Sequence, residues 1–240
     1  MAFIHGKGTA ALYNEHDLSS YFNDGAASHS VETAETTVFG NDDKTYIVGL
    51  RDGTVSLSGM FDGSTDAVDD VLRQSLGTED GGITTICYGG ATAGNRASLA
   101  QVETTSYDIS MPVSDVVAAS AEFQVDGGLR HGFALVDLAS LSADGQSTGV
   151  DYTAGATGWT AHLHVTANTF TDVLDVKLQD STDNAVWADL TGGAFTQVAA
   201  STTTSEKISG AGAYNRYVRI DYNFGTGTGA ATILVAFATN

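Results

Sequence analysis

The sequence has 240 residues, of which 29 are acidic and 10 basic, and its formal net charge is −19. A chain of this length can fold as one large domain or two ordinary domains with a real hydrophobic core. The Lys and Arg residues do not cluster, which argues against a phosphate-binding surface of the kind that DNA-reading proteins use, and the single cysteine, Cys87, excludes an internal disulfide and a four-cysteine zinc site.

The N-terminal residues 1–7 lack the apolar core of a signal peptide, and no stretch approaches the roughly 20 apolar residues of a membrane span. We therefore expect a soluble protein that is not exported by the usual route. Its acidity is compatible with a channel wall, because a like-charged surface keeps DNA from sticking while the polymer slides. The same acidity fits a salt-loving host, since at about 1 M salt the Debye length falls to roughly 3 Å and self-repulsion weakens.

The first part of the chain reads as strands separated by turns. Residues 54–61 alternate apolar Val55, Leu57 and Phe61 with polar neighbours, as a half-buried strand does. The preceding residues 23–52 show little continuous strand pattern and predict a long loop, which is usually functional in a compact domain. This predicted loop carries Asp42, Asp43, Lys44 and Arg51.

One helix is predicted over residues 64–76, because apolar residues recur there at helical spacing. Ser64 or Thr65 can cap its N-terminus, acidic residues occupy its first turns, and Gly77 follows its end. The helix has only one apolar face, so we expect it to pack across one end or face of a β-sheet.

Two further strands are predicted over residues 101–111 and 116–125. The second has a clean apolar face, whereas the first has none, which suits a surface that meets neighbouring subunits or a water-filled lumen. The candidate residues for that surface are Glu103, Tyr107, Asp108, Glu122 and Gln124. Cys87 lies among strand-like neighbours and is expected to be a small buried apolar residue.

A change in composition marks residues 142–158 as a linker between a first domain, residues 1–141, and a second domain, residues 159–240. Several short strands with regular turn signals predict that the second domain is an antiparallel β-sandwich. The predicted fold class is therefore mainly β: a β-sandwich or barrel with one packed helix, followed by a C-terminal β-sandwich.

Catalytic motifs are weak in this chain. Residues 145–149 match the Gly-x-Ser-x-Gly pattern around Ser147, but the strand before it and the helix after it are missing, so a flexible linker is the better interpretation. Residues 6–11 resemble a dinucleotide-binding turn without its preceding strand or its crossover helix. A hydrolase built on Ser147 remains a third alternative, and we expect no enzyme and no cofactor.

Ligand-binding patterns also have stronger structural explanations. His162 and His164 lie two apart on the predicted solvent face of one strand and could share a metal, but no third ligand is evident. The residues Asp180, Asp183, Asn184 and Asp189 lack the spacing of a calcium loop and fit an Asx-rich turn. A carbohydrate-stacking platform is the alternative to core packing for the aromatic residues Trp159, Trp187, Tyr214, Tyr217 and Tyr222.

The first domain resembles the major tail tube protein of long-tailed double-stranded DNA viruses. The matching phrases are GTAALYN (8–14), DLS (17–19), YFN (21–23), ETAETT (32–37), FG (39–40), GLRDG (49–53) and VSLSGMFDG (55–63). The order of strands, one helix and more strands agrees with that family, whereas the resemblance is weaker in the second domain.

The resemblance implies a structural virion protein, made in the host cytoplasm and located in the viral tail. It implies hexameric rings that stack into a tube, with tape measure, tail terminator and baseplate proteins as partners and with DNA passing through unbound. In that family a long hairpin loop reaches the next ring, which assigns inter-ring stacking to Asp42, Asp43, Lys44 and Arg51. The alternative is a glycan- or receptor-binding β-sandwich module of a tail fibre or capsid decoration.

Overall fold

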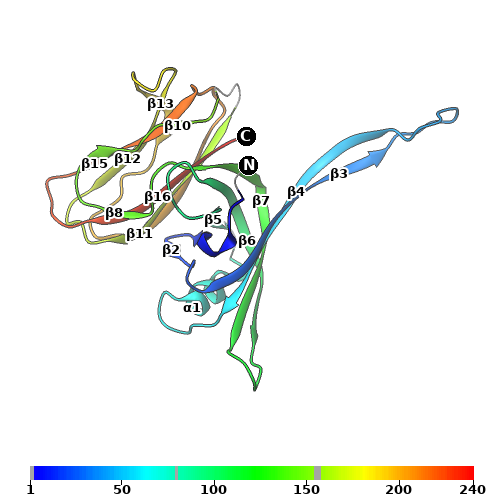
Figure 1. Cartoon of the computed structure of the whole chain (residues 1–240), viewed down its shortest axis with the longest axis horizontal. Coiled ribbons are helices and arrows are strands. Elements are labelled where there is room, and N and C mark those ends of the chain that lie inside the picture. The colour runs from blue at the N-terminus through cyan, green and yellow to red at the C-terminus, as the bar shows by residue number, and fades with distance from the viewer. Residues whose placement is uncertain (1–2, 79–80, 154–157) are drawn as a thin grey trace.

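The computed structural model describes residues 3–78, 81–153 and 158–240. These residues form two antiparallel sheets and one α-helix, as the mainly β prediction requires (Figure 1). The elements of the first half are η1 (Gly6–Gly8), β1 (Ala10–Tyr13), β2 (His16–Asp17), β3 (Phe22–Glu35), β4 (Tyr46–Met60), α1 (Val68–Ser75), β5 (Gly82–Cys87), β6 (Arg96–Ser110) and β7 (Ala118–Ala134). Those of the second half are β8 (Ala139–Leu141), β9 (Gly145–Gln146), β10 (Val150–Asp151), β11 (Trp159–Asn168), β12 (Leu174–Ser181), β13 (Ala188–Ala194), β14 (Thr204–Gly210), β15 (Tyr217–Phe224) and β16 (Ala231–Thr239).

The larger sheet, sheet A, has 11 strands in the described residues and joins the two halves of the chain. Its main path runs β14-β11-β16-β7-β6-β5-β1-β2, and β3 and β4 extend it beside β7. The junction is the pairing of β16 with the end of β7, where Ala238 lies opposite Gly132. Sheet B contains β10, β15, β12, β13 and β9.

The strands of this region stack in three layers: sheet B, then β11 and β16, then β1, β5 and β6. The middle layer, β11 and β16, is buried on both faces. One face of these two strands packs on sheet B through a core that includes Trp159, Leu163 and Phe237. Their other face packs on β1, β5 and β6 through small residues such as Ala236 and Cys87. Strands covered on both sides read as continuous apolar runs, which fits the sequence Ala231–Thr239 of β16.

A separate core lies between α1 and the sheet formed by β4, β7 and β6. Helix α1 buries Val68 and Leu72, which lie one turn apart, against Val55 and Phe123. The helix is shorter than predicted: it begins after Ala67, which makes no side-chain cap, and neither Ser64 nor Thr65 caps it. Gly77 does follow the helix with a φ of +72°, a conformation that favours glycine.

The predicted linker, residues 142–158, contains two short strands. β9 and β10 both pair with β15, so this segment is part of sheet B. Residues 154–157 of the predicted linker lie outside the described residues. The division into domains at residues 1–141 and 159–240 stays a prediction. Sheet A crosses it, and the core shared with sheet B includes Leu135 and Val136 from the first predicted domain.

Candidate assembly surface

Four strands, β3, β4, β7 and β6, form a sheet with one uncovered face. The strand register places its side chains in three rows across the four strands. These rows are Ser28-Thr54-Gln124-Glu103, Ala26-Ser56-Glu122-Ser106 and Asp24-Ser58-Ser120-Asp108. We call these twelve residues the polar face; none is buried, four are acidic and none is basic.

The opposite face of the same four strands is covered by the core around α1. Val55, Leu57, Ala121 and Phe123 alternate with residues of the polar face and are buried. One face of the sheet therefore meets the protein interior and the other meets water, which is the pattern of an antiparallel sheet covered on one side. The alternation in residues 54–61 and 116–125 is explained by this arrangement.

Of the predicted surface residues, Glu103, Asp108, Glu122 and Gln124 lie together on the polar face. The grouping with Tyr107 was wrong, because Tyr107 points to the α1 side. The reason is a register shift between Thr104 and Ser106, which moves the following residues to the other face. Burial, together with the neighbouring Asp69 carboxylate, raises the pKa of Tyr107 to about 12.

Two backbone edges flank the polar face. Among the described residues, β3 pairs with β4 alone, so its outer edge has no partner strand. At the other side, β5 pairs with β6 only up to Val102, and beyond a single bridge at Thr104 the outer edge of β6 is open. Unpaired sheet edges are templates for pairing with another chain.

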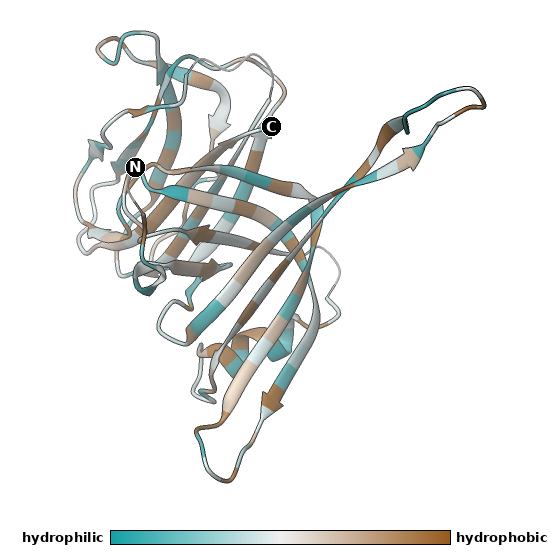
Figure 2. Ribbon diagram, turned by 45° about the vertical axis from the view of Figure 1, so that its right-hand side comes forward, coloured by the Kyte–Doolittle hydropathy of each residue, from teal (hydrophilic) through white to brown (hydrophobic). Residues whose placement is uncertain are grey.

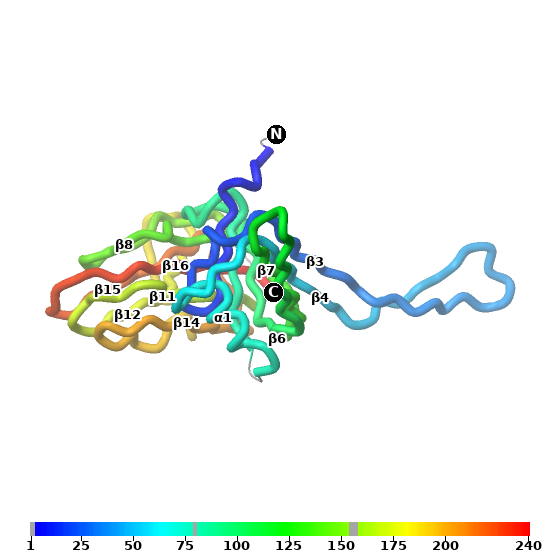
Figure 3. Tube along the Cα trace, turned by 90° about the horizontal axis from the view of Figure 1, so that it is seen from below, coloured from blue at the N-terminus to red at the C-terminus, as the bar shows by residue number. Residues whose placement is uncertain are grey.

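The predicted long loop is instead a β-hairpin that extends beyond the body of the protein (Figure 3). We call residues 30–52 the arm; within it the ends of β3 and β4 pair only with each other. The amide of Gln124 donates hydrogen bonds to Asp52 and to the carbonyl of Gly53 at the base of the arm. Strand alternation is absent from this sequence because all the arm residues are exposed.

The four predicted stacking residues all lie on the arm. Asp42, Asp43 and Lys44 are in the segment that connects β3 to β4, and Lys44 Nζ lies 2.9 Å from Glu35 Oε2. Arg51 lies opposite Val31 on the exposed hairpin. Lys44 and Arg51 are two of the chain's ten basic residues.

His162 and His164 are fully buried, so the prediction that they face solvent was wrong. The Nδ1–H of His164 donates to the carbonyl of Asn14 at 2.6 Å, which leaves its Nε2 to accept from the hydroxyl of Thr85 at 2.8 Å. Thr85 then accepts from Nδ1–H of His162 at 3.1 Å, and Nε2 of His162 has no partner among the described residues.

This chain of hydrogen bonds requires the imidazole of His164 to be neutral, because its Nε2 accepts a hydrogen bond. Burial, opposed by the hydrogen bond to Asn14, lowers the pKa of His164 to about 4. Burial, His164 and Lys207 lower the pKa of His162 well below its ordinary value. The two histidines thus join β11 to β5 and to the turn after β1 rather than forming a metal site.

The Asp-rich turn also has structural partners. The carboxylate of Asp183 accepts hydrogen bonds from the backbone N–H groups of Ala185 and Val186, and Asp180 accepts from the N–H of Asn215. Within the described ranges, no group of three or more His, Cys, Asp or Glu residues could hold a metal ion. In the same residues no helix is long and apolar enough to cross a membrane.

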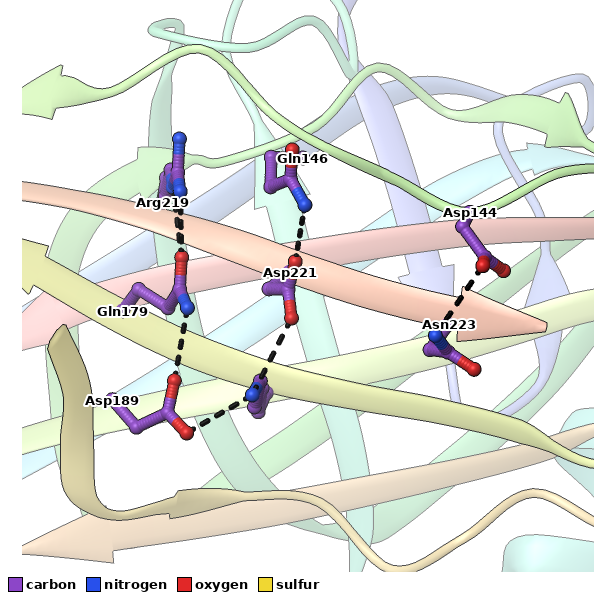
Figure 4. Close-up of polar contacts among 8 residues, drawn as sticks. Asp144, Gln146, Gln179, Asp189, Arg219, Asp221 and Asn223 are labelled. Carbon is purple, nitrogen blue, oxygen red and sulfur yellow. Dashed lines mark hydrogen bonds and ion pairs between the residues drawn. The ribbon is translucent and has the colours of Figure 1, made fainter. Parts of the chain in front are cut away.

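The outer face of sheet B carries polar side chains that bind one another (Figure 4). Arg219 donates to Gln179, whose amide donates to Asp189 at 2.9 Å. Lys177 lies 2.9 Å from Asp189 and 3.4 Å from Asp221. These contacts join β15, β12 and β13 across the face.

The five aromatic residues of the suggested stacking platform do not form one surface. Trp159 and Tyr214 are buried and pack on Phe237, and Tyr222 packs on Phe224. Trp187 lies under the guanidinium of Arg219, and Tyr217 lies under that of Arg216.

Ser147 lies between β9 and β10 and bonds to the backbone of β15. Its hydroxyl accepts from the N–H of Ile220 at 3.0 Å, and its own N–H donates to the Ile220 carbonyl. The helix that a nucleophile elbow requires does not follow it, because the next described elements are β10 and β11. The geometry therefore gives no support to a hydrolase at Ser147.

Comparison with known proteins gives distant similarities only. No protein-family model matches the sequence, and no curated protein matches it. Among solved structures, a chain from the virion of a native gene transfer agent particle has a TM-score of 0.43 at 16% identity and covers 53% of this chain and 97% of its own. The Dit hub protein of phage SPP1 has a TM-score of 0.38 at 13% identity, with 97% and 99% covered. At these scores, below 0.5, the likenesses do not establish the function of this chain.

Proposed function

We propose that this protein is the structural subunit of a viral tail tube, which assembles into stacked hexameric rings through which DNA reaches the host. The polar face between two unpaired strand edges carries this proposal. The polar face is a solvent-exposed, acidic sheet surface, and the unpaired edges of β3 and β6 can hydrogen-bond to strands of neighbouring copies. The hexameric number comes from the tail tube resemblance.

Ring closure uses the two edges. The open part of β6 in one copy pairs with the outer edge of β3 in the next copy, and repetition around an axis closes a continuous barrel. Such a contact is heterologous, because it joins two different surfaces, and it forms a ring when the rotation closes. Closure also removes the exposed edges that would make an isolated copy prone to aggregation.

The polar face lines the bore of this barrel. Its acidic side chains, Asp24, Glu103, Asp108 and Glu122, carry charge of the same sign as the DNA phosphates. With no basic residue on the polar face, no ion pair forms with the phosphates and DNA slides without being retained. The remaining side chains are small and mostly hydroxylic, which keeps the surface hydrated.

Sheet B then lies on the outside of the tube. The core around α1 separates the polar face from the rest of the protein, and β12 and β15 lie on the side of the body away from the arm (Figures 1 and 3). In this orientation the second predicted domain, residues 159–240, faces outward. The protein resides in the virion tail, with tape measure, tail terminator and baseplate proteins as its partners.

Negative-stain electron microscopy of the purified protein at increasing salt tests the proposal. Copies with a formal charge of −19 repel one another, and molar salt reduces the screening length to roughly 3 Å. Rings or tubes with an open channel, more abundant at high salt, are the expected result. Monodisperse monomers at every salt and protein concentration would contradict self-assembly.

A further inference from the structure

A pocket of about 160 Å³ lies where strands of sheet A from the two halves of the chain pack on each other. Its polar lining comes from four strands and includes Gln101 of β6, Arg130 of β7, His162 of β11 and Lys207 of β14. Leu99 at its wall belongs to the apolar core between the halves, and Figure 2 shows the apolar strands of this region in brown. None of the described lining residues is Asp or Glu, although the chain has a net charge of −19.

Two cationic side chains meet at this pocket. Arg130 Nη2 donates to the carbonyl of Gly127 at 3.3 Å, and a Cβ on Gly127 would lie 3.9 Å from Lys207 Nζ, so both cations lie beside Gly127. Lys207 Nζ also donates to Oε1 of Gln101 at 2.9 Å. Neither cation forms an ion pair with any residue that the structure describes. Burial lowers the pKa of Lys207, the exposed Asp126 opposes this, and Arg130 adds to it, so the charged ammonium lacks a counterion.

His162 contributes a buried hydrogen-bond acceptor to the same pocket. The hydroxyl of Thr85 donates to His164, so the Thr85 oxygen accepts from Nδ1–H of His162. Burial holds the pKa of His162 well below its ordinary value, which leaves the ring neutral and its Nε2 with a free lone pair. No described residue donates to this Nε2, and His162 is fully buried. Because Nδ1 faces Thr85, which does not line the pocket, the Nε2 side of the ring is the one turned toward it.

These groups together call for a small anion that carries a hydroxyl group. Water supplies a donor for Nε2 of His162 but no negative charge for Lys207 and Arg130. Sulfate, a carboxylate and the phosphodiester of a nucleic acid supply charge, but none of them has a hydroxyl at pH 7. Inorganic phosphate at pH 7 has both charged oxygens and a P–OH group. Charged oxygens form strong hydrogen bonds with lysine and arginine, so phosphate satisfies all three side chains.

We propose that this pocket binds one inorganic phosphate ion, with Lys207 and Arg130 donating to its charged oxygens and Nε2 of His162 accepting from its hydroxyl. The ion bridges β14 in one half of the chain to β7 in the other, so it ties the two halves of sheet A together. This inference does not depend on the tube proposal, because all of its contacts lie within one copy.

Isothermal titration calorimetry of the whole chain at pH 7, in a phosphate-free buffer at fixed ionic strength, measures the binding. Saturable binding of one phosphate per chain is the expected result. Sulfate should bind at least roughly fivefold more weakly, because it leaves Nε2 of His162 unpaired. Absence of saturable phosphate binding, or sulfate binding as tight as that of phosphate, would overturn the proposal.

A short single-stranded oligonucleotide, at the same concentration of phosphate groups, tests nucleic acid as the source of the phosphate. No binding is expected, because its phosphodiesters lack a hydroxyl and the net charge of −19 repels a polyanion. An oligonucleotide that competes with inorganic phosphate for the pocket would overturn the assignment to a free ion.

Removal of each cation tests the assigned contacts. Lys207→Met and Arg130→Met should each weaken phosphate binding by roughly tenfold or more, because each removes a charge-assisted hydrogen bond. Lys177→Met is the matched control: Lys177 lies on sheet B and pairs with Asp189 and Asp221, so its loss should leave the affinity unchanged. Wild-type affinity in both K207M and R130M would contradict the proposed site.

Thermal unfolding gives a second readout that tests the bridge. At a phosphate concentration about 100 times the Kd, Tm should rise by about 5 to 10 °C over its value in chloride. Phosphate and sulfate also stabilise proteins by exclusion from their surfaces, so the rise is compared with that of K207M and with sulfate at the same ionic strength. A rise of equal size in the wild type and in K207M would show a general salt effect and overturn the bridging role.

Discussion

The buried histidine pair predicts that stability falls as the solution becomes mildly acidic. In the folded protein the pKa of His164 is about 4, against an ordinary value of 6.5. The unfolded chain therefore binds more protons between these two values, and stability present above pH 6.5 is lost as the pH falls toward 4. The lowered pKa of His162 acts in the same direction.

The size of the effect follows from linkage. A group with a pKa of about 4 when folded and 6.5 when unfolded loses about 2 kcal/mol of stability between pH 7.5 and pH 5. For a chain of this size, 2 kcal/mol lowers Tm by about 4 to 8 °C. His164 is fully buried, so solvent does not screen the effect.

This decrease in Tm is measured by thermal unfolding at pH 7.5 and pH 5, at fixed protein and salt concentrations. His162→Gln with His164→Gln should be less stable at pH 7.5 but lose much less Tm on acidification than the wild type. His5→Gln, a change at an exposed histidine, should keep the full wild-type difference. Equal acid sensitivity in the double variant and the wild type would show that the buried histidines do not cause the loss of stability.

Three further predictions concern the sheet junction, the cysteine and the polar face. Gly132→Ala should lower the free energy of unfolding in urea by at least about 2 kcal/mol, because the new Cβ would lie 1.9 Å from the carbonyl oxygen of Phe237. The control Gly212→Ala should change stability little, since no atom lies within 4 Å of its Cβ. A neutral G132A would show that β7 and β16 are not closely paired. Cys87 should resist alkylation at pH 8 until the chain is unfolded, and rapid labelling of the native protein would contradict its burial. The double variant Asp108→Lys, Glu122→Lys should make assembled tubes retain DNA at low salt in a filter-binding assay. The control double variant Asp137→Lys, Asp175→Lys, at exposed positions outside the polar face, should not retain it. Equal retention by the two would place the polar face outside the bore.

The sequence predicted those parts of the fold in which one face of a strand is buried in a core and the other is exposed to solvent. The alternation around Val55 and Phe123 led to the correct faces because the core around α1 covers only one side of β4 and β7. Four of the five surface candidates share the polar face: Glu122 and Gln124 through this alternation, and Asp108 with Glu103 only because of the register shift on β6. Tyr107 was misplaced because the register shift near Thr105 breaks the strict period of two.

Other features leave no such pattern in the sequence. The arm has no covered face, so its strands show no alternation although β3 and β4 are long. Strand β11 is covered on both faces, which buries His162 and His164 on the side that alternation assigned to water. The joining of sheet A across both halves depends on contacts between distant residues, such as Gly132 and Ala238, that local sequence does not report.

The most direct test of the central claim is a three-dimensional reconstruction of the assembled protein by electron cryomicroscopy. The account predicts rings of six copies in which β6 of one copy pairs with β3 of the next and Glu103, Asp108 and Glu122 face an open bore. A closed assembly whose channel is lined by sheet B, or rings in which the polar face is buried between copies, would contradict it.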